Sequence, residues 1–473
     1  MFLALDQGTT SSRSILFSDD GQILACAQEE IPQIFPEPGW VEQDLERIWQ
    51  SQLATARRAL SEAGVHAREV KAIGIANQRE TVALWARKTG RPAANAIVWQ
   101  DRRTADVCER LKADGWEETI QQKTGLVIDP YFSATKIQWL NQHVGDGDWC
   151  VGTIDAFLLF RLTNGRLHAT DVTNASRTML FNIHSIRWDE QLCRLFGVKA
   201  EQLPTPLPSD SCFGVTAAEH FGAEIPICGV VGDQQAAAFG QGCTSPGSLK
   251  NTYGTGSFLL ANIGGKPLRS RHKLLTTLAW QTSQETAYAF EGSVFVAGSA
   301  IQWLRDGLGI IQRSDEIEAL AASVGDSGGV CFVPAFAGLG APYWDAYAKG
   351  ALTGLTRGTG KAHIARAALE AVCLQTLDVV EAMQADCPVP LNELRVDGGM
   401  AVNDLLMQMQ ADVLGLPVVR PSLAETTAFG AAKMAGMPGA LEAGRVFEPK
   451  ATDAWRAELK DRWRDAVHRT RTY

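Results

Sequence analysis

Three short apolar segments of this chain each end in an aspartate beside a glycine-rich turn. Residues 3–5 precede Asp6, the segment ICGVVG precedes Asp233, and the segment LRV precedes Asp397 and two glycines. Helix-like sequence follows the last two segments, as QQAAAFGQ and VNDLLMQMQADVLG. In open α/β sheets, ligands bind at the carboxyl ends of strands, beside helix N-termini that favour anions. One such aspartate is explained as a helix cap or turn residue, but the three together predict a phosphate-binding cleft.

The chain alternates strand-like and helix-like patterns in both halves, which predicts the α/β class. The helix-like segment DLERIWQSQLATARRALSEAG lies between strand-like runs at residues 2–5, 14–17, 23–27, 72–76 and 82–85. A length of 473 residues is too great for one hydrophobic core, so at least two domains are expected.

Two segments, one in each half, have similar sequences. LDQGTTSSRSILF opens the chain, and NTYGTGSFLLANI begins at residue 251. Each has Gly-Thr-x-Ser at a tight turn before a strand-like run. We therefore expect two related halves, divided within the turn-rich segment GQGCTSPGS into residues 1–244 and 245–473.

Composition excludes several classes of protein. A net charge of −9 argues against a general nucleic-acid binder, which needs a basic surface. The ten cysteines form no CxxC pair, so a zinc site or a compact disulfide framework is not expected, and a reducing cytosol suits them. The N-terminus has no basic leader, and the longest apolar stretch, GGVCFVPAFAGLGAPYW, is interrupted by glycine and proline. We expect a cytoplasmic protein that is not integral to a membrane.

Familiar phosphate-binding loops are absent from the sequence. The segment GTGKA has Ala362 where a Walker A loop needs serine or threonine, and no GxGxxG follows a strand. The remaining candidate is the hairpin DQGTTSSR, in which Asp6 could hold Mg²⁺ through water and the donors to phosphate are Thr9, Thr10, Ser11 and Arg13. A Ser/Thr-rich hairpin without a ligand is the alternative.

A second unusual segment is AIGIANQRETVALW, in which two strand-like runs surround Gln78-Arg79-Glu80-Thr81. Turns favour glycine, asparagine, aspartate or proline, and neither Arg79 nor Glu80 has their backbone freedom. From the residues alone, the plainest interpretation is an exposed turn with both charges in water.

Motifs distributed from residue 2 to about 430 identify a family: DQGTTSSR, PGWVEQD, NQRET, AIVWQDRRTA, TGLVIDPYFSATK, TDVTNASRTMLFNI, GDQQAA, NTYGTGSF, AGSAIQWLRD, GLGAPYWD and RVDGGMAVND. In this order the sequence resembles the FGGY carbohydrate kinases of the actin-like ATPase superfamily, and among them those that phosphorylate glycerol. The resemblance implies two actin-like (ribonuclease H-like) domains with an active-site cleft between them, binding MgATP and glycerol.

The resemblance also implies roles for single residues on the substrate side. An arginine only donates hydrogen bonds and an ionised glutamate only accepts them, so Arg79 and Glu80 together can bind two neighbouring hydroxyls. Asp233 matches the family's catalytic base. Matches to the other substrate contacts and apolar walls are Tyr131, Gln234, Trp99 and Phe258.

On the nucleotide side, the resemblance assigns both hairpins and two later motifs to ATP. The matching residues are Thr9, Thr10, Ser11, Arg13, Thr255, Gly298, Gln302, Gly399 and Asn403, with Asp6 as the Mg²⁺ residue. The implied reaction converts glycerol and ATP to sn-glycerol 3-phosphate and ADP.

Two alternatives remain beside this reaction. An FGGY kinase for another polyol or a ketose such as a pentulose is one, although NQRET argues against it. An actin- or chaperone-like ATPase is the other, although such a protein has no use for a set of residues that binds hydroxyls.

Two segments depart from the family pattern. EHFGAEIPI at 219–227 is short and lacks the Gly-rich, Arg-bearing insertion associated with sugar-bisphosphate inhibition in some members. The C-terminal segment, from VFEPK onward, resembles the family only loosely and is expected to form an amphipathic helix that packs back on its domain. A homo-oligomer, dimer or tetramer, is expected from the family.

Overall fold

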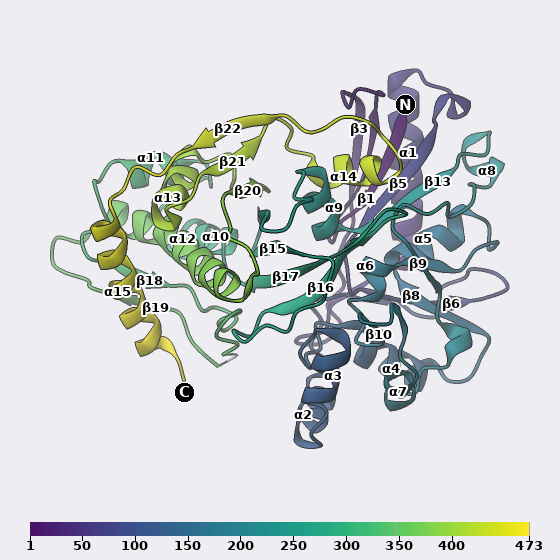
Figure 1. Ribbon diagram of the computed structural model, residues 1–473, viewed down its shortest axis with the longest axis horizontal. Coiled ribbons are helices and arrows are strands. Elements are labelled where there is room, and N and C mark those ends of the chain that lie inside the picture. Colours follow the sequence, from purple (N-terminus) through teal and green to yellow (C-terminus); the bar gives the residue numbers. More distant parts are fainter. Residues whose placement is uncertain (346, 473) are drawn as a thin grey trace.

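The computed structural model describes residues 1–345 and 347–472, and it contains two mixed β-sheets flanked by helices (Figure 1). The first sheet has the strand order β13 (Ile227–Gly232), β5 (Ala72–Asn77), β1 (Phe2–Gln7), β2 (Ser11–Phe17) and β3 (Ile23–Glu30). β1 is parallel to β5, and β5 to β13, whereas β2 is antiparallel to both β1 and β3.

The second sheet repeats this arrangement and adds one strand at each edge. Its order is β16 (Leu275–Gln281), β17 (Thr286–Val294), β15 (Ser257–Gly264), β14 (Leu249–Tyr253), β20 (Leu394–Asp397), β21 (Val418–Pro421) and β22 (Ala443–Phe447). The strands of the hairpin β14–β15 are antiparallel, like those of β1–β2. Strands β14, β20 and β21 are parallel to one another, like β1, β5 and β13. The similarity between the two hairpin sequences therefore reflects a duplicated fold, and the expected relation between the halves is confirmed.

Helices cover the sheets and carry part of the core. α1 (Leu45–Ala63) starts at Asp44, whose carboxylate accepts hydrogen bonds from two backbone N–H groups of the first turn, and it packs on β2 and β3. α12 (Lys361–Asp386) is largely buried against β15, β17 and neighbouring helices. Besides α9 and α14, described below, the other helices of eight or more residues in the described part of the chain are α2 (Ala105–Ala113), α3 (Glu117–Thr124), α4 (Ser133–Val144), α5 (Ile154–Leu162), α10 (Gly298–Asp306), α13 (Asp404–Leu414) and α15 (Asp453–Thr470).

Short elements complete the chain. A third sheet consists of β4 (Glu42–Gln43), β7 (Ala96–Ile97), β6 (Val82–Ala86) and β8 (Trp149–Thr153), and three strand pairs are β9 (Ala169–Asp171) with β12 (Thr205–Leu207), β10 (Phe181–Asn182) with β11 (Arg187–Trp188), and β18 (Cys331–Val333) with β19 (Ala351–Thr353). The short helices are α6 (Val172–Ala175), α7 (Glu190–Leu195), α8 (Ala218–Phe221), α11 (Glu316–Ala322), and the 3₁₀ turns Ala67–Glu69 and Ala200–Gln202.

Two helices join the halves by packing across them. α9 (Asp233–Gly240) follows β13 of the first sheet and contacts β14 and β15 of the second, whereas α14 (Thr426–Met434) follows β21 and packs on β1, β5 and β13. They also contact each other, and a Cβ at Gly430 would lie 1.9 Å from the carbonyl oxygen of Ala236. Glycine is therefore required at this crossing, because any side chain would push the two backbones apart.

The structure confirms the expected strands and helices and corrects two details. β1 continues through Asp6 to Gln7, so Asp6 lies within its strand. β5 and β6 belong to different sheets, so the segment Gln78–Thr81 joins two sheets and is not a hairpin turn.

The C-terminal helix packs as expected on its domain. Trp463 of α15 is 1% exposed, and its Nε1 donates to Asp378 Oδ2 at 2.7 Å. Among the described residues, no helix is long and apolar enough to cross a membrane.

Candidate active site

The segment between β5 and β6 is buried, and its two charges are not in water. Arg79 and Glu80 are 3% and 1% exposed, which excludes the exposed turn that the sequence alone favoured. Glu80 has a φ of +60°, a left-handed conformation that a glutamate rarely adopts. Such a backbone persists only where surrounding contacts hold it, as they often do at functional sites.

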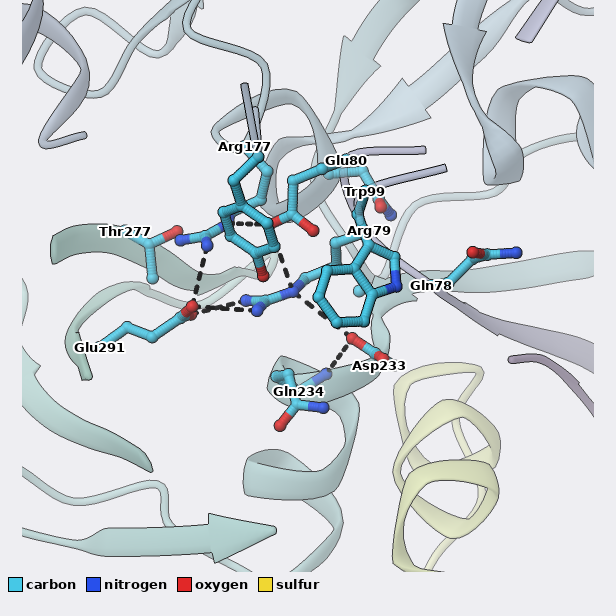
Figure 2. A network of polar contacts seen from close by, with 12 residues as sticks. Gln78, Arg79, Glu80, Trp99, Arg177, Asp233, Gln234, Thr277 and Glu291 are labelled. Atoms are coloured by element: carbon cyan, nitrogen blue, oxygen red, sulfur yellow. Dashed lines mark hydrogen bonds and ion pairs between the residues drawn. The ribbon is translucent and has the colours of Figure 1, made fainter. Parts of the chain in front are cut away.

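Two arginines and two glutamates form a buried network around this segment, shown in Figure 2. Arg79 donates from Nη1 and Nη2 to both carboxylate oxygens of Glu291, at 2.7 and 3.0 Å. Arg177 donates from Nη2 to Glu291 Oε1 at 2.8 Å and from Nε to Glu80 Oε1 at 2.6 Å. The four formal charges cancel, and each carboxylate accepts a charge-assisted hydrogen bond, which offsets the cost of burial.

The network affects its two carboxylates differently. Burial opposes the ionisation of Glu291, but Arg177 and Arg79 outweigh it and lower the pKa of Glu291 to about 2. At Glu80, burial outweighs Arg79 and Arg177 and raises the pKa of the carboxyl. Glu291 is therefore the firmly ionised member that holds both guanidinium groups.

Arg79 and Glu80 keep hydrogen-bonding groups that are not used within the charged network. An arginine has five N–H donors, and Arg79 uses two on Glu291 and one on Gln235 Oε1 at 3.1 Å. Its Nε lies 3.4 Å from Asp233 Oδ1 and 3.7 Å from Glu80 Oε1. The hydrogen bond that Glu80 accepts from Arg177 ends on Oε1, which leaves Oε2 for another donor. The pair thus keeps both donor and acceptor capacity.

Three aromatic side chains lie beside the charged network: Trp99 and Phe258, predicted as apolar walls, and Tyr131, predicted as a polar substrate contact. The ring of Trp99 lies edge-to-face with Tyr131 and Phe258, at centroid distances of 5.6 and 6.1 Å. The guanidinium carbon of Arg177 lies 5.7 Å from the ring centroid of Tyr131, and Trp99 Nε1 donates to Thr9 Oγ1 at 2.9 Å. The aromatic cluster therefore connects the charged network to the first hairpin.

Asp233 is the first residue of α9, next to Arg79. Its Oδ1 accepts from the backbone N–H of Gln234 at 2.7 Å, and its side chain is 29% exposed, so the carboxylate is accessible from outside the protein. Burial outweighs Arg79 and Lys250 and raises the pKa of Asp233. A carboxylate with a raised pKa is a better proton acceptor than an ordinary aspartate.

The second hairpin, the start of α10 and the end of β20 form one compact unit. The N–H of Gly298 donates to the carbonyl of Gly254 at 2.9 Å, and a Cβ at Gly298 would lie 2.6 Å from that oxygen. Gly398, the residue before Gly399, has a φ of +87° and approaches the carbonyl of Tyr253. The fold therefore brings Thr255, Gly298 and Gly399 together, while Thr9, Thr10 and Ser11 belong to the β1–β2 hairpin of the other half.

Of the residues predicted to bind the nucleotide, two make hydrogen bonds elsewhere in the protein and one is exposed on a helix. Asn403 caps α13, because its Oδ1 accepts from the N–H of Leu406 at 2.8 Å. Arg13 pairs with Glu425 and donates to Gln28 Oε1 at 2.9 Å. Gln302 is exposed on α10, and no hydrogen bond joins Gln302 or Asn403 to the charged network in the described residues.

Asp6 has the chemistry expected of a residue that binds a cation. Its carboxylate accepts no hydrogen bond from a described residue, and burial, with Asp233 and Glu425, outweighs Arg13 to raise its pKa to about 7. A bound cation would relieve this uncompensated carboxyl, and Mg²⁺ characteristically keeps several waters beside one or two carboxylates. Within residues 1–345 and 347–472, no group of three or more metal-binding side chains occurs, so a magnesium ion here would stay hydrated.

Sequence reasoning missed four residues of the site: Arg177, Gln235, Lys250 and Glu291. Lys250 lies in β14 and Glu291 in β17, and both are fully buried. A charged residue within an apolar strand-like run, as in AYAFEGSVFV, was the signal that could have found Glu291. Arg177 lies inside a motif that carried the resemblance, without a role assigned to it.

Comparison with known proteins identifies the class. Residues 1–240 match the model of the FGGY family of carbohydrate kinases, N-terminal domain, and residues 249–438 match its C-terminal domain. The chain therefore belongs to the FGGY family of carbohydrate kinases, and the predicted α/β two-domain fold is confirmed.

Several individual proteins are similar to this chain over essentially its whole length. The chain is 55% identical to the glycerol kinase of Aromatoleum aromaticum, with 99% of this chain and 98% of that protein covered, and 53% identical to the glycerol kinase of Deinococcus radiodurans, with 100% and 97% covered. The crystal structure of Plasmodium falciparum glycerol kinase with ADP matches with a TM-score of 0.92 and 35% identity, covering 99% and 98% of the two chains. A xylulose kinase from Lactobacillus acidophilus matches with a TM-score of 0.88, 21% identity and coverage of 99% and 98%, which shows the shared fold alone.

Proposed function

We propose that this protein transfers the γ-phosphoryl group of ATP to glycerol, giving sn-glycerol 3-phosphate and ADP. The observation that carries the proposal is identity of 53–55% over essentially the whole chain with the glycerol kinases of Aromatoleum aromaticum and Deinococcus radiodurans. The buried donor–acceptor pair at Arg79 and Glu80 supports it, because a polyol needs hydrogen-bonding partners of both kinds.

Glycerol binds, in this proposal, between the charged network and the aromatic cluster. Arg79 donates to one hydroxyl and Glu80 accepts from its neighbour, while the hydroxyl of Tyr131 and the amide of Gln234 add polar contacts. Trp99 and Phe258 line the carbon chain. A wrong substrate would leave the buried polar groups unpaired, which makes such a site selective.

The chemistry assigned to Asp233 is that of a general base. Its carboxylate accepts the proton of the primary hydroxyl as that oxygen forms a bond to the γ-phosphorus and the bond to the bridging oxygen of ADP breaks. Its raised pKa suits this proton transfer. When bound at Asp6 through water, Mg²⁺ supplies charge neutralisation on the phosphates.

The nucleotide lies between the halves in this proposal, which we divide at residues 1–244 and 245–473. Thr9, Thr10, Ser11 and Arg13 bind phosphate from the first hairpin. On the other side, the second hairpin binds phosphate and the later motifs bind the adenosine, through Thr255, Gly298, Gln302, Gly399 and Asn403. The cap at Asn403 uses its Oδ1, so the Nδ2 hydrogens remain for the nucleotide.

The experiment that tests the function is ADP release from MgATP with glycerol, then with ketoses and other polyols, and with no acceptor. Saturable turnover with glycerol, well above the rate without acceptor, is the expected result. Turnover with a pentulose alone would overturn the substrate assignment. Hydrolysis of ATP that does not depend on any polyol would instead support an actin- or chaperone-like ATPase.

We also propose a cytoplasmic location and a homo-oligomer, dimer or tetramer. All ten cysteines are free thiols, as a reducing compartment would keep them. Light scattering of the purified protein measures the oligomeric state.

A further inference from the structure

Lys250 is a buried lysine that no step of the proposed reaction uses. It lies in β14, is 0% exposed, and its Nζ donates to Gln234 Oε1 at 2.5 Å and to Thr252 Oγ1 at 2.7 Å. Gln234 follows Asp233 at the start of α9, and Thr252 lies in β14, the first strand of the second hairpin. One ammonium group thus connects the proposed substrate side with the proposed nucleotide side.

Two carboxylates provide the charge that compensates Lys250. Burial lowers the pKa of Lys250, while Asp397 and Asp233 oppose that effect. Asp397 Oδ2 accepts from Gln241 Nε2 at 2.9 Å and from Thr426, but its buried Oδ1 has no hydrogen-bond partner in the described part of the chain. The positive charge of Lys250 therefore acts on one carboxylate at the end of β20 and on the other at the start of α9.

A lysine at this position is costly unless it contributes something beyond packing. Removing an ammonium group from water is strongly unfavourable unless partners compensate its charge. Methionine would fill a similar volume in the strand without that cost. A role in packing alone therefore does not account for a charged group in β14.

We propose that Lys250 is a positioning residue for phosphoryl transfer, which holds the first turn of α9 against the first strand of the second hairpin. This inference rests on the proposed function. Through Gln234, Lys250 orients the turn that carries Asp233. Through Thr252, it fixes the start of the hairpin that contains Thr255, so the proposed base and the proposed phosphate site keep one relative position.

The charge of Lys250 has a second effect on the proposed base. Together with Arg79, it favours the ionised form of Asp233 and so counteracts the rise in the pKa that burial causes. Loss of the ammonium would therefore leave Asp233 both less firmly oriented and more readily protonated.

The test compares Lys250→Met with the unchanged protein in steady-state kinetics, using glycerol and MgATP. A loss of orientation at the reacting atoms is expected to lower kcat about 100-fold or more. The KM for ATP should stay within about threefold, since no proposed nucleotide contact is removed. A folded Lys250→Met protein with kcat within about threefold of the unchanged protein would overturn the proposal.

Further variants separate positioning from stability. Thr252→Val keeps the ammonium and removes one of its hydrogen bonds, so its kcat should fall less than that of Lys250→Met. Lys433→Met removes a partly buried lysine of α14 whose Nζ donates to the carbonyl of Gly439, and it should leave kcat unchanged. If Lys250→Met does not fold, Lys250→Gln and Thr252→Val carry the test. A thermal midpoint that falls in these variants while kcat stays unchanged would contradict the proposal and support a purely structural role.

Failure of this inference can be distinguished from failure of the proposed function. The unchanged protein's dependence on glycerol decides the function without any variant. If its acceptor is instead a ketose, the Lys250 variants are measured with that ketose, and a selective loss of kcat still supports positioning. If the unchanged protein hydrolyses ATP without an acceptor, the inference is overturned together with the function on which it rests.

Discussion

Replacing Glu291 with glutamine removes one negative charge from the buried network of Arg79, Glu80, Arg177 and Glu291. In the structure, Glu291 accepts three charge-assisted hydrogen bonds, two from Arg79 and one from Arg177. A glutamine keeps one acceptor oxygen and turns an amide N–H₂ toward a guanidinium. Removing one partner from a buried ion pair typically costs about 3–5 kcal/mol.

We expect much of this cost to appear in glycerol binding, because Glu291 fixes the orientation of Arg79. About 3 kcal/mol corresponds to a KM for glycerol raised by about 100-fold. The KM for ATP should change by less than about threefold, since no proposed nucleotide residue contacts Glu291. Steady-state ADP release with each substrate varied in turn measures both constants.

The pH dependence of stability gives a second measurement of the same residue. The pKa of Glu291 falls from 4.5 to about 2 on folding. A depressed pKa contributes stability that is fully present above the ordinary pKa and is lost as the pH falls toward the folded value. The unfolding midpoints of Glu291→Gln and the unchanged protein should therefore converge as the pH falls from about 4.5 toward 2.

Glu381→Gln is the matched control, because Glu381 also pairs with two cations but lies at the surface. Its carboxylate contacts Lys460 at 2.5 Å and Arg464 at 3.1 Å, and its side chain is 36% exposed. Exposed ion pairs contribute about 0–1 kcal/mol, so neither KM should move. If folded Glu291→Gln kept a KM for glycerol within about threefold, Glu291 would not orient Arg79 for substrate.

Three further predictions concern other parts of the molecule. Asp233→Asn should lower kcat by about 10²–10⁴-fold at an unchanged unfolding midpoint, and near-full turnover would remove Asp233 as the base. Gly430→Ala places a Cβ 1.9 Å from the carbonyl of Ala236 and should lower stability by about 1–3 kcal/mol in denaturant titration, which an unchanged midpoint would contradict. Burial raises the pKa of Asp378 to about 7. The free energy of unfolding should therefore fall by up to about 1.4 kcal/mol per pH unit as the pH rises from about 4 to about 7. Asp378→Asn should reduce that slope. An equal slope in the variant and the unchanged protein would show that Asp378 does not cause this pH dependence.

Much of the fold followed from local sequence patterns. The apolar runs that precede Asp6, Asp233 and Asp397 lie in β1, β13 and β20, because short apolar segments bounded by turn residues are strong strand signals. The two Gly-Thr-x-Ser hairpins indicated the duplication, and the structure gives both the same place in their sheets. The roles assigned to the site residues remain predictions, since the resemblance and not the geometry supplied them.

The sequence by itself determined the α/β class and the two related halves, because strand and helix patterns depend on near neighbours along the chain. Its family motifs supplied most of the candidate residues. Only the tertiary structure decided how the charges are balanced. Glu291 binds an arginine 212 residues away, and Arg177 binds a glutamate 97 residues away, so no local pattern connects them. Arg79 and Glu80 would be an exposed turn in an isolated segment. Folding buries them between the halves, where long-range partners replace water and give the two side chains a single orientation.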